Sequence, residues 1–254
     1  MTEAMAPPGA SFLATRKGQL TLAFLCLVAF MDFMGFAIMT VALPTIQRDL
    51  HFSQQNLQWV ISGYTVTYGG FLLLGGRLAD LLGRRVTLVT GTAVFAITSV
   101  LGGAAPNAGT LVGARLAQGI GAALMPPAAL SILTTTFNAS TDRVKALGAW
   151  GAMAGLSSAL GVFLGGAISA SPGWRWVLYI NVPICAVVII AAYLLVSGEA
   201  PRRSGLASFD TPGALLGTGG MLLLIYALVT APDNGGGRPR RSASSPPRPC
   251  CWPP

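Results

Sequence analysis

The sequence predicts an all-α membrane protein with seven transmembrane helices. Of its 254 residues, 53% are hydrophobic and only 9% are charged, whereas charged residues make up about a quarter of a typical soluble domain. A helix needs about 20 apolar residues to cross the hydrocarbon layer, where backbone groups find no water. Stretches of about this length occur at residues 19–43, 57–75, 86–104, 109–134, 147–170, 176–197 and 212–230.

The first stretch, 19–43, follows Arg16 and Lys17 and is too long for the apolar core of a cleavable signal. We therefore expect residues 1–18 to form a tail and the stretch to remain as the first helix. Asp32 is its deepest acid, roughly 20 Å along the helix from either end. The carboxyl group could exchange protons during transport, or it could form a structural hydrogen bond between helices.

Basic residues fall on one side of the predicted helices, which orients the chain. Between the predicted helices, the opposite side holds little besides Arg48 and Arg175. Because Lys and Arg accumulate in cytoplasmic loops, the N-terminus, a linker at 198–211 and the start of the helix at 212–230 are predicted to be cytoplasmic. This topology also explains the formal charge of +8 without a nucleic-acid partner. The residues that set the orientation are Arg16, Lys17, Arg77, Arg84, Arg85, Arg143, Lys145, Arg202 and Arg203.

A charged segment, residues 76–85, separates the second and third stretches. Gly76 and Gly83 lack a Cβ atom, so they allow a tight turn and close approach to a neighbouring helix. Asp80 could accept hydrogen bonds from a helix N-terminus and pair with Arg84 or Arg85, and the arginines would hold the segment on the cytoplasmic side. Taken alone, the segment also fits an ordinary basic turn.

The stretch 109–134 contains Arg115, followed by Gln118 and Gly119. A charge inside a membrane costs several kcal/mol unless it is paired or hydrated, so Arg115 is a functional candidate. The alternative is that its long side chain reaches the nearby interface. Four residues apart in the stretch 57–75, Tyr64 and Tyr68 are candidates to line a substrate cavity.

Glycines recur four residues apart in the stretch 147–170. Gly151 and Gly155 form one pair, and Gly161 and Gly165, followed by Gly166, form another. Small residues at this spacing form a flat stripe that allows two membrane helices to pack closely.

These motifs together resemble the major facilitator superfamily of transporters. Residues 76–85 resemble its signature loop, which latches the two halves of such transporters, and residues 111–123 resemble the fourth-helix motif of its proton-coupled members. Gly161, Gly165 and Gly166 resemble the end of the antiporter motif, although Val162 replaces its proline. Resemblance to the fourteen-helix drug:proton antiporter branch rests on residues 41–44, 57–60, 174–176, 181–183 and 210–213.

The resemblance implies a fold and a function. The fold is a six-helix lobe at 19–197, made of two inverted three-helix repeats, plus a seventh helix at 212–230. It corresponds to the N-terminal half of a longer transporter, so we expect the chain to be truncated. The function is export of hydrophobic or cationic small molecules across the plasma membrane, driven by the proton gradient and no other cofactor. The branch usually places its first-helix Asp at the position of Gly35, three residues after Asp32.

Two alternatives stay open from the sequence. One is a metabolite carrier of the same superfamily. The other is a membrane fragment that does not transport unless two copies pair as a homodimer or a C-terminal lobe is added. Residues 231–254 form either a disordered Pro/Arg tail or the product of a shifted reading frame. The sequence contains no motif for a nucleotide-binding loop, a metal site or a nucleophile–base pair, so an enzyme is not expected.

Overall fold

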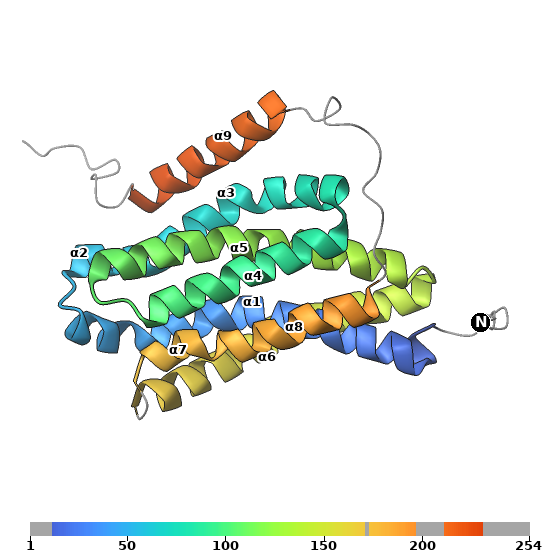
Figure 1. The fold of residues 1–254 in the computed structure, drawn as a ribbon, viewed down its shortest axis with the longest axis horizontal. Helices are drawn as coiled ribbons and strands as arrows, with labels where there is room; N and C mark the ends of the chain where they lie inside the picture. The colour runs from blue at the N-terminus through green and yellow to red at the C-terminus, as the bar shows by residue number, and fades with distance from the viewer. Residues whose placement is uncertain (1–11, 171–172, 197–210, 231–254) are drawn as a thin grey trace, which may run out of the picture.

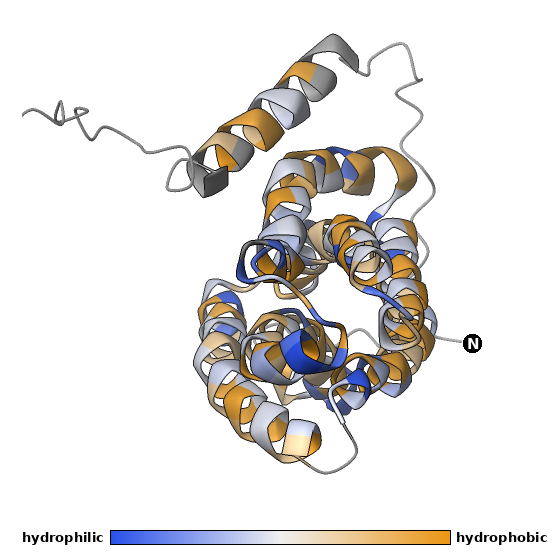
Figure 2. Ribbon diagram, turned by 90° about the vertical axis from the view of Figure 1, so that its left-hand side faces the viewer, coloured by the Kyte–Doolittle hydropathy of each residue, from blue (hydrophilic) through white to orange (hydrophobic). Residues whose placement is uncertain are grey.

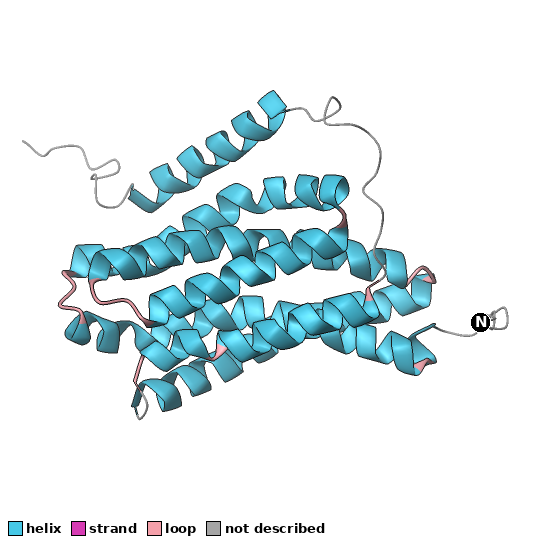
Figure 3. Ribbon diagram, in the orientation of Figure 1, coloured by secondary structure: helices cyan, strands magenta, loops and turns pink. Residues whose placement is uncertain are grey.

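The computed structural model describes residues 12–170, 173–196 and 211–230, and these residues form helices joined by short connections (Figures 1 and 3). A short 3-10 helix, Phe12–Ala14, precedes the first long helix. The α-helices are α1 (Arg16–Asp49), α2 (Gln54–Leu57), α3 (Trp59–Leu82), α4 (Arg84–Gly103), α5 (Ala108–Thr136), α6 (Ser140–Ala170), α7 (Arg175–Tyr179), α8 (Asn181–Leu195) and α9 (Thr211–Thr230).

The first helix is longer at both ends than the expected stretch 19–43. The hydroxyl of Thr15 caps α1 by accepting a hydrogen bond from the Gly18 amide at 3.0 Å. Pro44, which directly follows the expected stretch, lies inside the helix. With 34 residues, α1 is about 50 Å long at ~1.5 Å per residue, well beyond the ~30 Å hydrocarbon layer. Its ends therefore extend past the apolar layer.

The expected loop at 76–85 is mostly helical, which corrects the sequence prediction. Residues 76–82 continue α3, and Gly83 alone separates α3 from α4. Leu and Ala, which favour helix, occupy most positions up to Leu82. Gly83 has φ of 92°, a left-handed conformation that suits glycine, so the chain reverses at one residue.

Five described helical segments are long and apolar enough to cross a membrane: α1, α4, α5, α6 and the α7–α8 segment Arg175–Leu195. The sixth expected span, 176–197, is divided by Ile180 into α7 and α8. The second expected span lies in α3, which is outside this set because its glycines, tyrosines and threonines lower its hydropathy. In α9, the described apolar stretch is Leu216–Ile225.

The packing of the long helices follows a pairwise pattern. Helix α5 packs against both α3 and α4, α1 packs against α6, and α4 packs against α8. If α1, α3 and α4 form one repeat and α5, α6 and α8 form the other, the equivalent helices are α1 and α5, α3 and α6, and α4 and α8. Under this exchange the α1–α6 pair becomes the α5–α3 pair. This is the pattern expected of two three-helix repeats related by a two-fold axis.

The connections gather at the two ends of the bundle. The turns α3–α4 and α5–α6 and the end of α8 lie at the right in Figure 1, which we call the basic end because it carries Arg84, Arg85 and Lys145. Viewed from the opposite end, strongly hydrophilic colour concentrates in the connections (Figure 2). Helix α9 lies outside the bundle against α3.

Three expected segments fall largely outside the described residues. Of the tail 1–18, the structure describes residues 12–18, and of the linker 198–211 it describes Thr211. The segment 231–254 lies wholly outside them.

Candidate functional site: a buried polar network

Asp32 is buried near the middle of α1 and bonds to two tyrosines of α3. Its side chain is only 6% exposed. The Tyr68 hydroxyl donates to Oδ2 at 3.0 Å, and the Tyr64 hydroxyl donates to Oδ1 at 3.4 Å. The two tyrosines are one helical turn apart, and their rings are stacked with centroids 5.8 Å apart. The two tyrosines that the sequence suggested as cavity-lining residues therefore both donate a hydrogen bond to the carboxyl group of Asp32.

Arg115 of α5 is the largest fully buried side chain among the described residues, with 1% exposed. Its Nε donates to the Val60 carbonyl of α3 at 3.0 Å. The guanidinium also lies over the Tyr64 ring, 4.2 Å from the centroid, in cation–π geometry. Arg115 therefore points into the bundle, and the geometry does not support the alternative in which it reaches the interface.

Gln118 continues the network from α5 to α4. Its Oε1 accepts a hydrogen bond from Nη1 of Arg115, and its Nε2 donates to Ser99 Oγ at 2.7 Å. Ser99 in turn donates to the Phe95 carbonyl at 2.7 Å. Sequence reasoning paired Arg115 with Gln118, but it missed Ser99, because a single serine in an apolar helix carries no distinguishing pattern.

Close approach of α3 and α5 makes these bonds possible. A Cβ atom on Gly119 would lie 2.5 Å from the Tyr64 carbonyl oxygen, so only glycine fits there. A Cβ on Gly75 would lie 2.5 Å from the Ala123 carbonyl oxygen. Thr67 of α3 donates to the Leu116 carbonyl at 2.8 Å and adds a bond between the two helices. Gly119 was predicted from the motif, whereas Gly75 was not.

The network connects an acid and a base without direct contact between them. Among the described residues, Asp32 and Arg115 form no ion pair, and Tyr64 lies between them, bonded to one and stacked on the other. Nη2 of Arg115 is buried and has no hydrogen-bond partner within the described ranges. Tyr64 therefore links the Asp32 carboxyl group to the Arg115 guanidinium group.

The predicted gating residues lie at the basic end, outside this network. Arg84 Nη1 donates to Thr135 Oγ1 of α5 at 2.6 Å, and Arg85 Nη1 donates to the Val196 carbonyl after α8 at 3.3 Å. Asp80 is exposed, and in the described part of the chain it forms no ion pair with either arginine. The turn is thus attached to α5 and α8 through its arginines.

Gly76 does not provide the close approach that the sequence predicted. A Cβ there would lie 3.9 Å from Pro127, which is ordinary van der Waals contact. The close approach belongs to the neighbouring Gly75, because rotation about the helix axis places residue 75 against α5.

The glycines of α6 divide into two groups. A Cβ on Gly161 would lie 2.8 Å from Ala37 Cβ, and one on Gly165 would lie 3.0 Å from the Ile38 carbonyl oxygen, so both pack against α1. By contrast, a Cβ on Gly151, Gly155 or Gly166 would meet nothing within 4 Å among the described residues. The predicted stripe therefore packs against α1 at Gly161 and Gly165, and Gly166 faces away.

The fold and the network define a helical membrane protein with an acid and a base buried at its centre, the arrangement found where membrane proteins move ions or solutes. The family model of the Major Facilitator Superfamily matches residues 25–247. The chain belongs to this superfamily.

Curated relatives are similar in sequence to most of this chain. The puromycin resistance protein pur8 of Streptomyces alboniger is 44% identical over 203 residues, which are 80% of this chain and 40% of the relative. The cephamycin export protein CmcT of Amycolatopsis lactamdurans is 39% identical over 223 residues, which are 88% of this chain and 46% of the relative. The chain thus spans less than half the length of these relatives.

Solved structures support the fold. A bacterial homolog to the human lysosomal transporter Spinster, in an inward-facing and occupied conformation, matches with a TM-score of 0.59 and 21% sequence identity. The match covers 78% of this chain and 47% of that chain. At this identity the likeness concerns the fold alone.

Proposed function

We propose that this chain forms the proton-coupling lobe of a secondary transporter that exports drug-like small molecules, with Asp32 as the group that exchanges protons. The observation that carries the proposal is the buried contact of Asp32 with Tyr64 and Tyr68, in a chain similar to proteins named for antibiotic resistance and export. A buried ionisable group inside a membrane bundle is a functional candidate by default.

Protonation of Asp32 would rearrange the network. An ionised carboxylate only accepts hydrogen bonds, and in this structure both oxygens accept one from a tyrosine. After protonation, one oxygen carries a hydrogen and can donate it to the facing tyrosine oxygen, so that hydroxyl has to direct its own hydrogen elsewhere. Because the Tyr64 ring also lies against Arg115, a turn of this ring changes the contact with α5. The buried Nη2 of Arg115 supplies a donor for a polar group of the cargo.

Export requires a second lobe. Alternating access is a rocking of two lobes around a shared site, and the described residues form one six-helix lobe plus α9. The second lobe would be a further part of the same protein, another copy of this chain or a separate polypeptide. Without a second lobe, we expect no transport.

Reconstitution tests whether this chain transports a drug. The purified chain would be placed in liposomes, and puromycin uptake driven by an imposed proton gradient would be measured, with lincomycin as a second probe because another relative is named a lincomycin resistance protein. Gradient-driven drug uptake supports the transporter. Absence of gradient-driven flux for both drugs, in properly folded protein, contradicts it for this chain.

Two aspartate variants test the coupling role. Asp32→Asn keeps the size of the side chain but not the titration, so we expect gradient-driven flux to fall at least tenfold. The matched control is Asp49→Asn, on the same helix but exposed at its end; we expect its flux to stay within twofold of the unmodified chain. Unchanged flux in Asp32→Asn would show that another group couples protons.

The orientation is part of the proposal and has its own test. The basic residues favour a cytoplasmic basic end, with Asp49 and Arg175 outside the cell. In a chain without native cysteines, Asp80→Cys should react with an impermeant thiol reagent only from the cytoplasmic side, and Asp49→Cys only from outside. The reverse pattern would overturn the orientation.

A further inference from the structure

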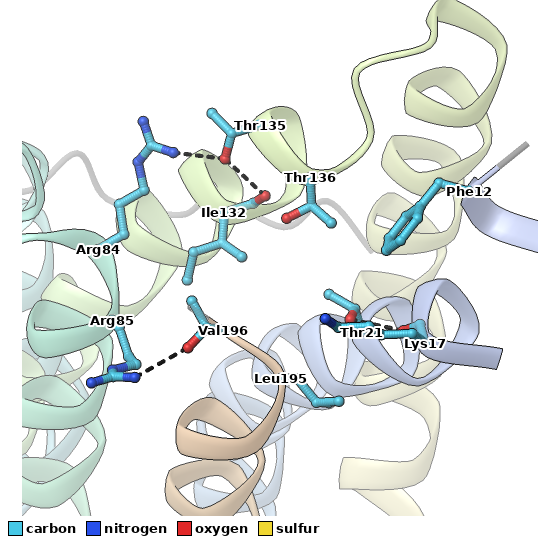
Figure 4. A pocket seen from close by; sticks show the side chains of 10 residues that line it. All are labelled: Phe12, Lys17, Thr21, Arg84, Arg85, Ile132, Thr135, Thr136, Leu195 and Val196. Atoms are coloured by element: carbon cyan, nitrogen blue, oxygen red, sulfur yellow. Dashed lines mark hydrogen bonds between the residues drawn. The ribbon is translucent and has the colours of Figure 1, made fainter. Parts of the chain in front are cut away.

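A pocket opens at the basic end of the bundle, away from the Asp32 network (Figure 4). Its volume is about 290 Å³, and residues from α1, α4, α5 and the end of α8 line it. The full set of lining residues is Phe12, Lys17, Thr21, Arg84, Arg85, Ile132, Thr135, Thr136, Leu195 and Val196. Nothing in the proposed transport step uses this space.

Three cations and no acid line the pocket among the described residues. Arg84 and Arg85 lie on one side, and Lys17 lies across from them (Figure 4). The arginines are held in place by Thr135 and by the Val196 carbonyl, so their guanidinium groups are positioned before any ligand binds. Several positive charges that line one pocket favour the binding of an anion there.

Lys17 is the cation whose position points most clearly to a ligand. Its ammonium group forms no hydrogen bond or ion pair with the described residues, although it faces a pocket with two arginines. Hydroxyl groups of Thr135 and Thr136 add polar contacts, whereas Phe12 and Leu195 add an apolar wall. The combination of basic, hydroxyl and apolar groups matches a charged group attached to a hydrocarbon.

We propose that this pocket binds the phosphate group of an anionic phospholipid. Basic pockets between transmembrane helices on the cytoplasmic side hold such headgroups, and the basic end is the end expected there. Arginine donates in a planar fork that matches phosphate oxygens, and lysine adds a point charge. The apolar wall would contact the glycerol backbone and the first carbons of the acyl chains. Free phosphate shares the anionic chemistry but gains nothing from that wall.

Native mass spectrometry of the purified chain tests the proposal, with titration of phosphatidylglycerol and phosphatidylcholine as separate probes. Both lipids carry a phosphate, but the choline headgroup adds a cation that the basic pocket would repel. We expect phosphatidylglycerol to bind at least fivefold more tightly than phosphatidylcholine. A lysine near the membrane surface contributes about 1 kcal/mol to such binding, so Lys17→Gln should weaken phosphatidylglycerol binding about fivefold.

The matched control is Lys145→Gln. Lys145 is also an exposed lysine at the basic end, but it lies in α6 and does not line the pocket. We expect its affinity to stay within twofold, and Lys17→Arg to restore binding because the charge is kept. Thermal unfolding of each variant shows whether it is folded, and Lys17→Arg keeps the test valid should Lys17→Gln unfold.

Three results would overturn the proposal. Equal losses in Lys17→Gln and Lys145→Gln would indicate a diffuse charge effect, and equal affinities for the two lipids would exclude headgroup recognition. Displacement of the lipid by 1 mM inorganic phosphate would assign the pocket to a soluble anion. Because the readout is binding, these results are independent of whether the chain transports a drug.

Discussion

The α3–α5 and α1–α6 contacts are equivalent under the expected two-fold exchange, yet they are built differently. Both bring helices together at glycines, Gly119 in the first contact and Gly161 in the second. The first contact also has hydrogen bonds between the helices, from Arg115 to Val60 and from Thr67 to Leu116. In the second, no side-chain hydrogen bond joins the described residues of α1 and α6.

The α3–α5 contact is thus fixed by hydrogen bonds, whereas the α1–α6 contact is held by packing alone. Buried polar bonds have defined directions, so helices joined by them resist sliding, whereas van der Waals contacts tolerate small shifts. Helix α6 is also much less enclosed. In its most apolar 18-residue stretch, 17% is buried inside the protein, against 61% for the corresponding stretch of α5. We infer that α3 and α5 form the rigid part of the lobe and that α6 is the element with more freedom to move.

The largest expected effect is from Gly119→Ala. The new Cβ would lie 2.5 Å from a backbone oxygen, so α3 and α5 have to separate and the bonds between them weaken. We expect unfolding in mixed detergent and dodecyl sulfate micelles to become easier by about 1–3 kcal/mol. Gly151→Ala, where nothing lies within 4 Å, is the matched control and should change stability little. Equal effects of the two substitutions would show that the close approach at Gly119 does not stabilise the α3–α5 contact.

Gly161→Ala should have a smaller effect. Its Cβ would meet the Ala37 side chain at 2.8 Å, but no described hydrogen bond depends on this approach. A small shift of α6 relieves the clash, so we expect a cost of about 1 kcal/mol, at the low end for overpacking. The same unfolding assay measures it, with Gly166→Ala as the control. A cost as large as that of Gly119→Ala would show that α6 is held as firmly as α5.

Thr67→Val isolates a single bond of the fixed contact. The substitution keeps the shape but removes the hydroxyl that donates to Leu116. Bonds of this kind in membrane bundles contribute about 0.6 kcal/mol on average. The control is Thr65→Val, because Thr65 donates only to Ile61 of its own helix. If the two variants unfold alike, the hydrogen bonds do not explain why the α3–α5 contact is the firmer one.

Asp49→Asn should have the smallest effect. Asp49 accepts bonds from the Trp174 indole at 2.8 Å and from Arg175 at 2.6 Å, which ties the end of α1 to α7. Both charged side chains are over 40% exposed, so the ion pair is screened by water and salt. We expect a loss under about 0.5 kcal/mol that shrinks further in 0.5 M NaCl. A salt-independent loss would mean that the Trp174 bond, rather than the charge, stabilises this end.

Part of the candidate site was predictable because it follows from spacing along one helix. Arg115 and Gln118 are three residues apart and Tyr64 and Tyr68 are four apart, so each pair had to share a helix face. Their partners on other helices, Asp32 for the tyrosines and Ser99 for the glutamine, were not predictable as pairs. Contacts between helices depend on rotation and crossing angle, which no single helix records.

The sequence by itself determined where the long apolar helices lie and which end of the bundle is basic, because apolar length and charge act locally along the chain. It also determined that the chain would turn near Gly83. Only the tertiary structure decided that Gly75 rather than Gly76 touches α5, and that Tyr64 lies between Asp32 and Arg115. It also decided that a Cβ atom on four of the six glycines of α6 would meet nothing within 4 Å among the described residues. These outcomes depend on how each helix is rotated about its axis, and that rotation is set by all of its neighbours together.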